Sequence, residues 1–412
     1  MSVIGVIAEF NPLHNGHIEL LNHARTNLQA EYVIVVMSGD FTQRGNPAMI
    51  SKYDRAKLAL KHGADLIIEL PVLASTSSAE TFAKSGIAHL SATGLVTHLL
   101  FGCEDANMEM FRTAANLASS DSMDYHKTIN SFVKQGDSYA VARQKAIQMQ
   151  QKGVELPADF LSKPNNILGV EYVRTLASDI YDIEPICYPR TSSAHGSNKL
   201  GGAAASGSAI RNAMETNQAQ AAQPSIPEDV MKLLRFNAQF RTLLRSSDIS
   251  QLLHYKLIST DDFSEYSDCN EDISNKINKM KDRFVEFENF CSLLKSKDLT
   301  YARISRVLLH IALDITKEDV DHLGFCNYAP YLRILGFSKK GTLLLTQIKN
   351  SAKVPFFLSP QGGMPQLNTV EQSILKKDVY ASDVYRTLLT SKSGRVFPTE
   401  FTRKFELKDI NG

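Results

Sequence analysis

The sequence predicts an α/β protein, a Rossmann-like parallel sheet with helices on both faces, extended by a mainly α-helical C-terminal region. Three observations support this fold class. Short apolar runs of strand length alternate with helix-length stretches over residues 1–105. Polar or glycine-rich segments follow several of these runs, at the edge where parallel strands end. Helical patterns then dominate residues 228–317.

The first part of the chain carries the expected sheet. Val3 to Ala8 is nearly continuously apolar, as expected for a strand that is covered on both faces. The repeated order of strand and helix predicts parallel pairing, because each helix returns the chain to the same end of the sheet. The expected strands are 3–8, 32–37, 65–70 and 97–101, and the expected helices are 16–28, 51–62 and 78–90.

The later segments complete the outline. The pattern becomes helical over 106–152, another helix opens at Pro164, and a fifth strand is expected over 183–188. A loop of small and polar residues, 191–208, leads into a helix that begins near Ser206. Residues 218–227 have the composition of a linker, so we expect a first domain at 1–217 and a mainly helical region with a mixed tail at 218–412.

Composition and charge exclude several classes of protein. Hydrophobic residues make up 43% of the 412 positions and charged residues 22%, as in an ordinary globular enzyme. There is no apolar run of about 18 residues and no basic leader, so we expect a cytoplasmic protein without a membrane span. The five cysteines are scattered without a CxxC pair, which argues against structural zinc and disulfides.

The charge is unevenly distributed. The net charge is only +1, but residues 301–412 hold 16 Lys and Arg against 10 Asp and Glu, a local excess of +6. Such an excess is compatible with a partner that presents a phosphate backbone, although solvated basic surfaces are common.

The segment NPLHNGH, residues 11–17, joins the first strand to the first helix. Its glycine lets the backbone approach a phosphate, and the helix that follows supplies N–H groups and a positive dipole end. His14 and His17 can donate hydrogen bonds to phosphate oxygens as negative charge builds up at the α-phosphorus. The motif therefore predicts an enzyme that binds ATP and catalyses nucleotidyl transfer, with both histidines as catalytic residues.

A second phosphate-binding element is expected at the helix start near residue 206. Ser206 and Ser208 would grip the β- and γ-phosphates, and Arg211 is a third catalytic candidate because its charge would neutralise the departing pyrophosphate. The alternative is an ordinary helix cap with an exposed arginine.

The segment after the second strand should bind the molecule that is joined to AMP. Arg44 would hold a carboxylate, while Lys52 and Arg55 either reach phosphates or are surface charges. Gly102, after the fourth strand, leaves space for an adenine ring, and Cys103 beside it is expected to be a small buried residue. The expected acyl pocket consists of Ser38, Gly39, Asp40, Gln43 and Arg44.

Longer blocks surround these motifs: AEFNPLHNGH (8–17), MSGDFTQRG (37–45), GADLIIELP (63–71), PNNILGVEY (164–172), TYARISRVLLH (300–310) and YLRILGF (331–337). They resemble the bacterial tRNA(Met) cytidine acetate ligase family, within the HxGH nucleotidyltransferase-like superfamily. The resemblance implies activation of acetate by ATP to acetyl-AMP with release of pyrophosphate. The acetyl group would then pass to N4 of the wobble cytidine, position 34, of elongator tRNA(Met), forming N4-acetylcytidine. Two departures are Gly207, where the family more often has a side chain, and Cys103 in place of serine.

The resemblance also implies the site residues. Residues 1–217 would form the ATP-binding catalytic domain, and 218–412 the tRNA-binding region. Which of Asn165 and Asn166 contacts ATP stays open. The implied ATP contacts are Ile7, Ala8, Glu9, Phe10, Asn11, Pro12, Leu13, His14, Asn15, Gly16, His17, Ile18, Glu19, Leu20, Gly102, Asn165, Asn166, Arg190, Thr191, Ser206, Ser208 and Arg211.

The wobble base lies in a single-stranded loop, so the helical region should bind the anticodon stem-loop. Tyr301, Arg303 and Arg306 on one expected helix, together with Arg333, are the expected tRNA contacts, the alternative being a solvated basic helix face. Mg²⁺ is expected to accompany ATP, with Asp40 as one candidate contact and no metal site built by the protein alone.

Three other functions remain open. A small-molecule adenylyltransferase would share the fold and the HxGH motif, and another acetate-activating ligase would deliver acetyl to a protein-bound thiol. Neither would need the long basic C-terminal region. A non-catalytic tRNA-binding protein that holds ATP as a structural ligand would not need the intact histidine pair. The sequence does not indicate the oligomeric state.

Overall fold

The computed structural model describes residues 2–119, 155–178, 180–190, 205–216, 218–297 and 299–403, with a few positions between 127 and 149. Most of the helical stretch expected over 106–152 and most of the loop expected over 191–208, including Thr191, therefore lie outside the described residues. In the part of 106–152 that is described continuously, α5 (Met108–Ser119) is helical as expected.

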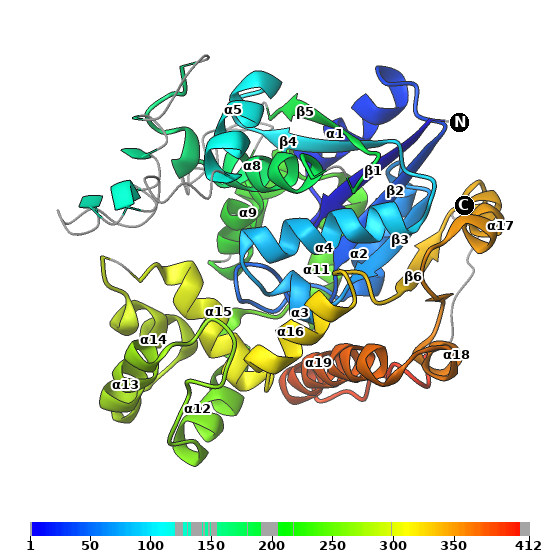
Figure 1. The fold of residues 1–412 in the computed structure, drawn as a ribbon. Helices are drawn as coiled ribbons and strands as arrows, with labels where there is room; N and C mark the ends of the chain where they lie inside the picture. The colour runs from blue at the N-terminus through cyan, green and yellow to red at the C-terminus, as the bar shows by residue number, and fades with distance from the viewer. Residues whose placement is uncertain are drawn as a thin grey trace.

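Seven strands form one sheet in the order β5-β4-β1-β2-β3-β6-β7. The five strands expected from the sequence pair in parallel with their neighbours, which confirms the Rossmann-like fold class (Figure 1). They are β1 (Val3–Ala8), β2 (Tyr32–Ser38), β3 (Leu66–Leu70), β4 (His98–Cys103) and β5 (Glu184–Pro189).

Two further strands come from the C-terminal region. β6 (Leu332–Phe337) pairs antiparallel with β3, and β7 (Phe356–Phe357) pairs parallel with β6. The sequence pattern predicts neither of them, and they make the sheet mostly rather than wholly parallel. The C-terminal region thus completes the sheet of the first half, and the division at residues 217 and 218 stays a prediction about function.

The sheet is covered on both faces. Along β2, Val33, Val35 and Met37 enter one apolar core, whereas Ile34 and Val36 enter the other, as the two-residue period of a strand requires. The first core is closed by α1 (Asn15–Thr26), α2 (Lys52–Lys61), α9 (Gly207–Glu215) and α11 (Glu228–Gln239). The second is closed by α4 (Ala79–Ala92), α8 (Pro164–Leu176), α15 (Tyr301–Ala312) and α19 (Thr369–Ser393), and Figure 1 shows α4 crossing in front of the sheet.

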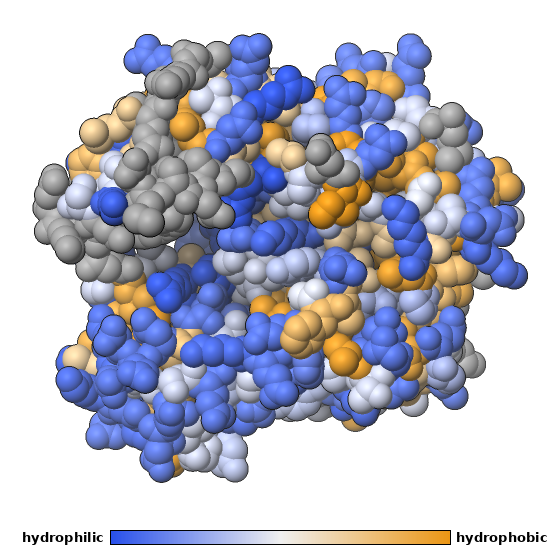
Figure 2. Space-filling view, in the orientation of Figure 1, coloured by the Kyte–Doolittle hydropathy of each residue, from blue (hydrophilic) through white to orange (hydrophobic). Residues whose placement is uncertain are grey.

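Shorter helices connect and extend these layers. Among them, α12 (Ser250–Ser259), α13 (Glu271–Met280) and α14 (Phe287–Leu294) form a group beside α15 at the lower left of Figure 1, and Figure 2 shows that this group is covered mainly by hydrophilic residues. The remaining helices of the described residues are α3 (Val72–Ser75), α10 (Ala219–Ala222), α16 (Lys317–Phe325), α17 (Gly341–Ser351) and α18 (Pro360–Gly363), with short 3₁₀ turns at 160–162, 223–225, 246–249, 281–283 and 364–366. Within the described ranges, no helix is both long and apolar enough to cross a bilayer.

One expectation about the second half needs correction, and another needs more detail. The expected linker at 218–227 is partly helical, and the carbonyl of Pro224 accepts a hydrogen bond of 2.9 Å from Asn15 Nδ2 at the start of α1. The tail is mixed, as expected, since it holds helices and the short strand β7, but the 25-residue helix α19 is not among the expected elements. Its N-terminus is closed by a reciprocal capping box between Asn368 and Glu371, and its C-terminus ends at Gly394, whose φ of 70° favours glycine.

Candidate active site

The HxGH loop lies between β1 and α1, at the carboxyl end of the middle one of the five parallel strands. His14 is the N-cap of α1 and is only 2% exposed, whereas His17 in the first turn is partly exposed. The two rings stack with centroids 3.7 Å apart, and the backbone N–H of His14 donates to Nδ1 of His17 at 3.3 Å. Because Nδ1 accepts, the neutral ring of His17 carries its proton on Nε2, the nitrogen that can donate to a phosphate oxygen.

Gly16 is required by the same stack. A Cβ at this position would lie 3.2 Å from Cε1 and 3.4 Å from Nδ1 of the His14 ring, which is tighter than ordinary van der Waals contact. Any side chain here would therefore require the His14 ring to move, which would disturb its stack on His17. The glycine of the motif serves the placement of the histidines as well as the approach of a phosphate.

The second expected phosphate element docks directly on this loop. Nη1 of Arg211 donates to the carbonyl of Asn11 at 2.6 Å, and a Cβ on Gly207 would lie 3.2 Å from the same oxygen. This contact explains why glycine is suitable at residue 207. The N-termini of α1 and α9, almost 200 residues apart in the chain, thus meet at one place, and both direct their positive dipole ends there.

Ser206 is the N-cap of α9, and its Oγ accepts the N–H of Ala209 at 3.3 Å. Its hydroxyl also lies 3.0 Å from that of Ser208. Ser206 therefore caps the helix, as the alternative from the sequence stated. The hydroxyls of Ser206 and Ser208 nevertheless lie together at the helix start, where the phosphate-binding pair is expected.

Three arginines gather around this point from separate segments. Arg44 follows β2 and is exposed, Arg190 follows β5, and Arg211 lies in the first turns of α9. Burial, and then the charge of Arg44, lower the pKa of Arg211; the same two effects lower that of Arg190, opposed by Glu104. Nε of Arg190 is buried and has no hydrogen-bond partner among the described residues. None of the three side chains forms an ion pair among the described residues, although the charge of Glu104 raises the pKa of Arg190 and that of Glu9 raises the pKa of Arg211. Such a group of like charges fits a polyanion such as a triphosphate.

The two asparagines at the start of α8 have different roles. Asn166 is fully buried, and its amide is saturated: Oδ1 accepts the N–H groups of Glu104 and Asp105, and Nδ2 donates to Asp105 and to the carbonyl of Phe160. Asn165 is partly exposed, and its Nδ2 donates to Glu104 Oε1 at 2.8 Å. The structure therefore assigns Asn166 to holding the end of β4 in place, which leaves Asn165 as the better candidate for a nucleotide contact.

The end of β4 is shaped for close packing. A Cβ on Gly102 would lie 3.1 Å from Cγ of Arg190, so the absence of a side chain lets Arg190 cross this strand. Cys103 is buried, as expected. Glu104 and Asp105, which hold the α8 asparagines, were not among the expected site residues, although acidic residues directly after a strand were a visible signal.

The expected acyl pocket divides into buried and outward-facing parts. Ser38, Gly39 and Asp40 are buried, whereas Gln43 is partly exposed and Arg44 is exposed. The hydroxyl of Ser38 has no hydrogen-bond partner within the described part of the chain. The N–H of Gln43 donates to Glu9 Oε1 at 2.8 Å, which ties this loop to the HxGH segment.

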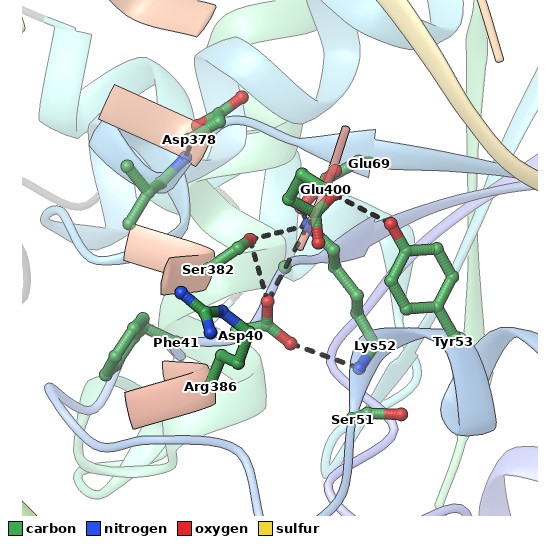
Figure 3. Close-up of polar contacts among 12 residues, drawn as sticks. Asp40, Phe41, Ser51, Lys52, Tyr53, Glu69, Asp378, Ser382, Arg386 and Glu400 are labelled. Atoms are coloured by element: carbon green, nitrogen blue, oxygen red, sulfur yellow. Dashed lines mark hydrogen bonds and ion pairs between the residues drawn. The ribbon is translucent and has the colours of Figure 1, made fainter. Parts of the chain in front are cut away.

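The Asp40 carboxylate is directed into a buried polar network, so Asp40 needs correction as a candidate Mg²⁺ contact. It is 7% exposed, and its oxygens accept from Lys52 N and from Ser382 Oγ at 3.2 and 2.9 Å (Figure 3). A Cβ on Gly39 would lie only 2.6 Å from Glu69 Oε1, so the backbone of this loop packs closely against the buried carboxylate of Glu69.

A network of buried charges lies behind the loop, as Figure 3 shows. Nζ of Lys52 lies 2.8 Å from Glu69 Oε1, 2.8 Å from Ser382 Oγ and 3.4 Å from Glu400 Oε2. Burial alone would raise the pKa of Glu400, but the charges of Lys52 and Arg333 hold it well below its usual range. The network joins α2, β3, β6, α19 and the segment at Glu400, so it fastens the C-terminal region to the sheet.

Arg333 belongs to this network, and its expected role in tRNA binding is wrong. The residue is 1% exposed, Nη1 lies 2.9 Å from Glu69 Oε2, and Nη2 is paired with Glu400. A guanidinium held by two buried carboxylates is not available to an RNA phosphate. Arg55 is likewise buried and donates to the carbonyls of Glu9, Ser38, Gly39 and Ile50, and Lys52 is fully buried, so neither reaches a phosphate.

The other expected tRNA contacts lie on α15. Arg306 is ion-paired with Asp268 at 2.7 Å, and Arg303 is partly exposed with Nη2 3.4 Å from the carbonyl of the same residue. Tyr301 is partly buried at the start of the helix. Their role in RNA binding stays a prediction. Arg303 is the better candidate of the two arginines, because its side chain makes a long contact to a backbone carbonyl, whereas Arg306 is held by a carboxylate.

The model of the family described as HIGH Nucleotidyl Transferase matches residues 1–397. A tRNA(Met) cytidine acetate ligase of Caldanaerobacter subterraneus subsp. tengcongensis is 33% identical over 386 residues, covering 93% of this chain and 95% of the relative. One of Syntrophomonas wolfei subsp. wolfei is 34% identical over 414 residues, covering 97% and 99%.

Two solved structures have the same fold. The crystal structure of Thermotoga maritima TmcAL in its apo form I superposes with a TM-score of 0.87 at 29% identity, covering 94% of this chain and 95% of that chain. The structure of the same protein bound with alpha-thio ATP superposes with a TM-score of 0.85, with the same identity and coverage.

Proposed function

This chain belongs to the HIGH nucleotidyl transferase family, together with relatives named tRNA(Met) cytidine acetate ligase, and we propose that it performs their reaction. It would activate acetate with ATP as acetyl-AMP and transfer the acetyl group to N4 of the wobble cytidine of elongator tRNA(Met). The observation that carries the proposal is the convergence of the stacked HxGH histidines with Arg44, Arg190 and Arg211.

In the first step, a carboxylate oxygen of acetate forms a bond to the α-phosphorus of ATP, and the bond from that phosphorus to the bridging oxygen of pyrophosphate breaks. His17 Nε2–H and the N-terminus of α1 stabilise the charge that builds up on the α-phosphate oxygens. Arg211 and the N-terminus of α9 hold the departing pyrophosphate. This assignment is supported by the Arg211–Asn11 contact, which brings both helix ends together.

In the second step, N4 of cytidine attacks the acetyl carbonyl, AMP departs, and the nitrogen loses a proton. The exocyclic amine is a weak nucleophile because its lone pair is delocalised into the ring, so the activation has to come from the acyl side. Arg44 is our candidate for holding acetate, because it is exposed beside the two phosphate-binding arginines. Ser38 and Gly39 precede Arg44 in the same segment and are buried, with Gly39 packed against Glu69.

Mg²⁺ would be carried by the nucleotide. Within the described ranges, no group of three or more His, Cys, Asp or Glu side chains is placed to hold a metal ion. Mg²⁺ commonly binds to phosphate oxygens and water with few protein ligands, and it would neutralise charge on the leaving pyrophosphate. The helical region 218–412 would bind the anticodon stem-loop, and the proposed reaction would take place in the cytoplasm, where tRNA is found.

A pyrophosphate-release assay separates this function from the alternatives. The purified protein is incubated with ATP and with acetate, tRNA, both or neither. We expect release to require acetate and to continue to turnover only when tRNA(Met) is present. Acetate-independent turnover with a nicotinamide or phosphopantetheine nucleotide would instead indicate a small-molecule adenylyltransferase.

A further inference from the structure

An exposed cluster of aromatic and arginine side chains lies at the C-terminal end of α11, outside the site described above. Phe236 is 57% exposed, and its ring meets that of Phe240 edge to face with centroids 4.5 Å apart. The guanidinium carbon of Arg395, which follows α19, lies 4.1 Å from the centre of the Phe240 ring. Arg235 and Arg241 flank the two rings in sequence and are exposed. These five residues are called the α11 platform below.

The helix pattern places the platform on the outer face of α11. Val230, Met231 and Leu234 are buried against the sheet, so positions 235, 236 and 239 face away from it. A large aromatic side chain on this face contributes little burial of apolar surface to the stability of the fold. Phe236 is exposed beside a second ring and an arginine, unlike the singly exposed apolar side chains that any surface carries.

The segment that carries four of the five platform residues has charges of one sign. Residues 232–245, KLLRFNAQFRTLLR, contain four basic side chains and no acidic one. Within the described part of the chain, Arg235, Arg241 and Arg395 form no ion pair; Arg235 donates instead to the neutral amide of Gln223 at 3.0 Å. The platform thus offers cationic groups and ring faces together, which favours a polyanion with flat bases over an apolar protein surface.

The platform is also tied to the active-site loop at both ends of its segment. Before α11, the carbonyl of Pro224 accepts from Asn15 Nδ2 in the HxGH motif. After α11, the N–H of Leu244 donates to the carbonyl of Met49 at 3.0 Å, and the N–H of Met49 donates to Asn11 Oδ1 at 2.8 Å. The segments before and after α11 thus both contact the segment that carries the catalytic histidines, directly or through Met49.

We propose that the α11 platform binds unpaired bases of the tRNA by stacking on Phe236, with Arg235, Arg241 and Arg395 contacting the flanking phosphates. Stacking needs a free base face, so an unpaired segment fits and an A-form duplex, whose bases are stacked on each other, does not. This inference rests on the proposed function. The platform is separate from α15, which carries the tRNA contacts expected from the sequence.

The test uses Phe236→Ala in the full-length protein, with Phe325→Ala as the matched control because Phe325 is also an exposed helical phenylalanine, at 76%. Binding is measured with tRNA(Met) and with a synthetic anticodon stem-loop that carries 2-aminopurine in its unpaired segment. We expect Phe236→Ala to raise the Kd about tenfold, equivalent to about 1.4 kcal/mol, and to abolish the quenching of 2-aminopurine. Phe325→Ala should change neither.

Acetate-dependent pyrophosphate release without tRNA serves as the independent reading. It should be unchanged in Phe236→Ala, which also shows that the variant is folded. If Phe236→Ala binds and quenches the RNA as the parent does, the proposal is overturned, and a protein contact becomes the better explanation of the platform. If the parent releases no pyrophosphate with acetate yet the variant loses RNA binding, the proposed function fails while the platform stands as an RNA site.

Discussion

Replacing Arg333 with methionine separates its role in the buried network from the role in tRNA binding expected from the sequence. Methionine keeps much of the length of the side chain but removes the charge that lies 2.9 Å from Glu69 Oε2 and is paired with Glu400. Both carboxylates would remain buried, with Lys52 as their remaining basic partner.

The magnitude follows from this geometry. Removing one partner from a buried charge pair typically costs 3–5 kcal/mol, because the remaining charge is left uncompensated. Lys52 stays within 2.8 Å of Glu69 and 3.4 Å of Glu400, so we expect a value near the lower end, about 3 kcal/mol. The pKa of Glu400 is held low in the folded protein, so this stabilisation is present near neutral pH and is lost as the pH falls below the usual range of a carboxyl group.

The assay is urea unfolding near neutral pH and again in acid, with Arg303→Met as the matched control. Arg303 is partly exposed without a buried ion pair, so its replacement should change the free energy of unfolding by less than about 0.5 kcal/mol. The folded Arg333→Met protein should bind tRNA with the parent's affinity. A variant that is as stable as the parent but binds tRNA weakly would refute the structural role assigned to Arg333.

Two further changes test the HxGH loop, and a third tests His89, a fully buried histidine of α4. His17→Ala should slow acetyl-AMP formation by about 100-fold or more with little effect on stability, because the ring acts on charge that exists in the transition state. Gly16→Ala should leave the helix as stable or more stable but slow the same step about tenfold, since the new Cβ would lie 3.2 Å from the His14 ring. His89→Leu should flatten the loss of stability on acidification: burial lowers the pKa of His89 to about 4 from 6.5, so folding opposes its protonation by about 3 kcal/mol across that window.

Each of these has a clear contrary outcome. Acetyl-AMP formed at the parent's rate by His17→Ala would remove the ring from the chemistry. A Gly16→Ala protein that is both unfolded and inactive would show that the glycine serves the fold and not the histidine stack. A His89→Leu protein with the parent's slope of stability between about pH 6.5 and pH 4 would mean that other groups govern the acid transition.

The elements that could be predicted best from the sequence are those defined by residues close together in the chain. The strand at Val3–Ala8 and the turn at residues 11–17 combine an apolar run, a glycine and a helix start within a few positions, and the structure has the strand as expected. The five parallel strands could be predicted for the same reason, since each apolar run is bounded by turn residues.

The errors lie where distant segments decide. Arg333 is buried because it pairs with Glu69 and Glu400. Both carboxylates are far from it in the sequence, so no local pattern reveals them as its partners. β6 was missed because a strand that joins the sheet antiparallel to β3 carries no βαβ signature. The long helix α19 was a different case: Asn368, Glu371 and Gly394 are visible start and stop signals, and they could have been used.

Mass analysis of nucleosides from tRNA(Met), incubated with the protein, ATP and acetate, examines the proposed reaction at its product. We expect cytidine to gain the mass of one acetyl group at the wobble position. The gain should require both ATP and acetate, and the His17→Ala protein should not produce it. Unmodified cytidine after incubation with a folded protein that consumes ATP and acetate would contradict the proposed reaction, because the acetyl-adenylate would then serve another acceptor.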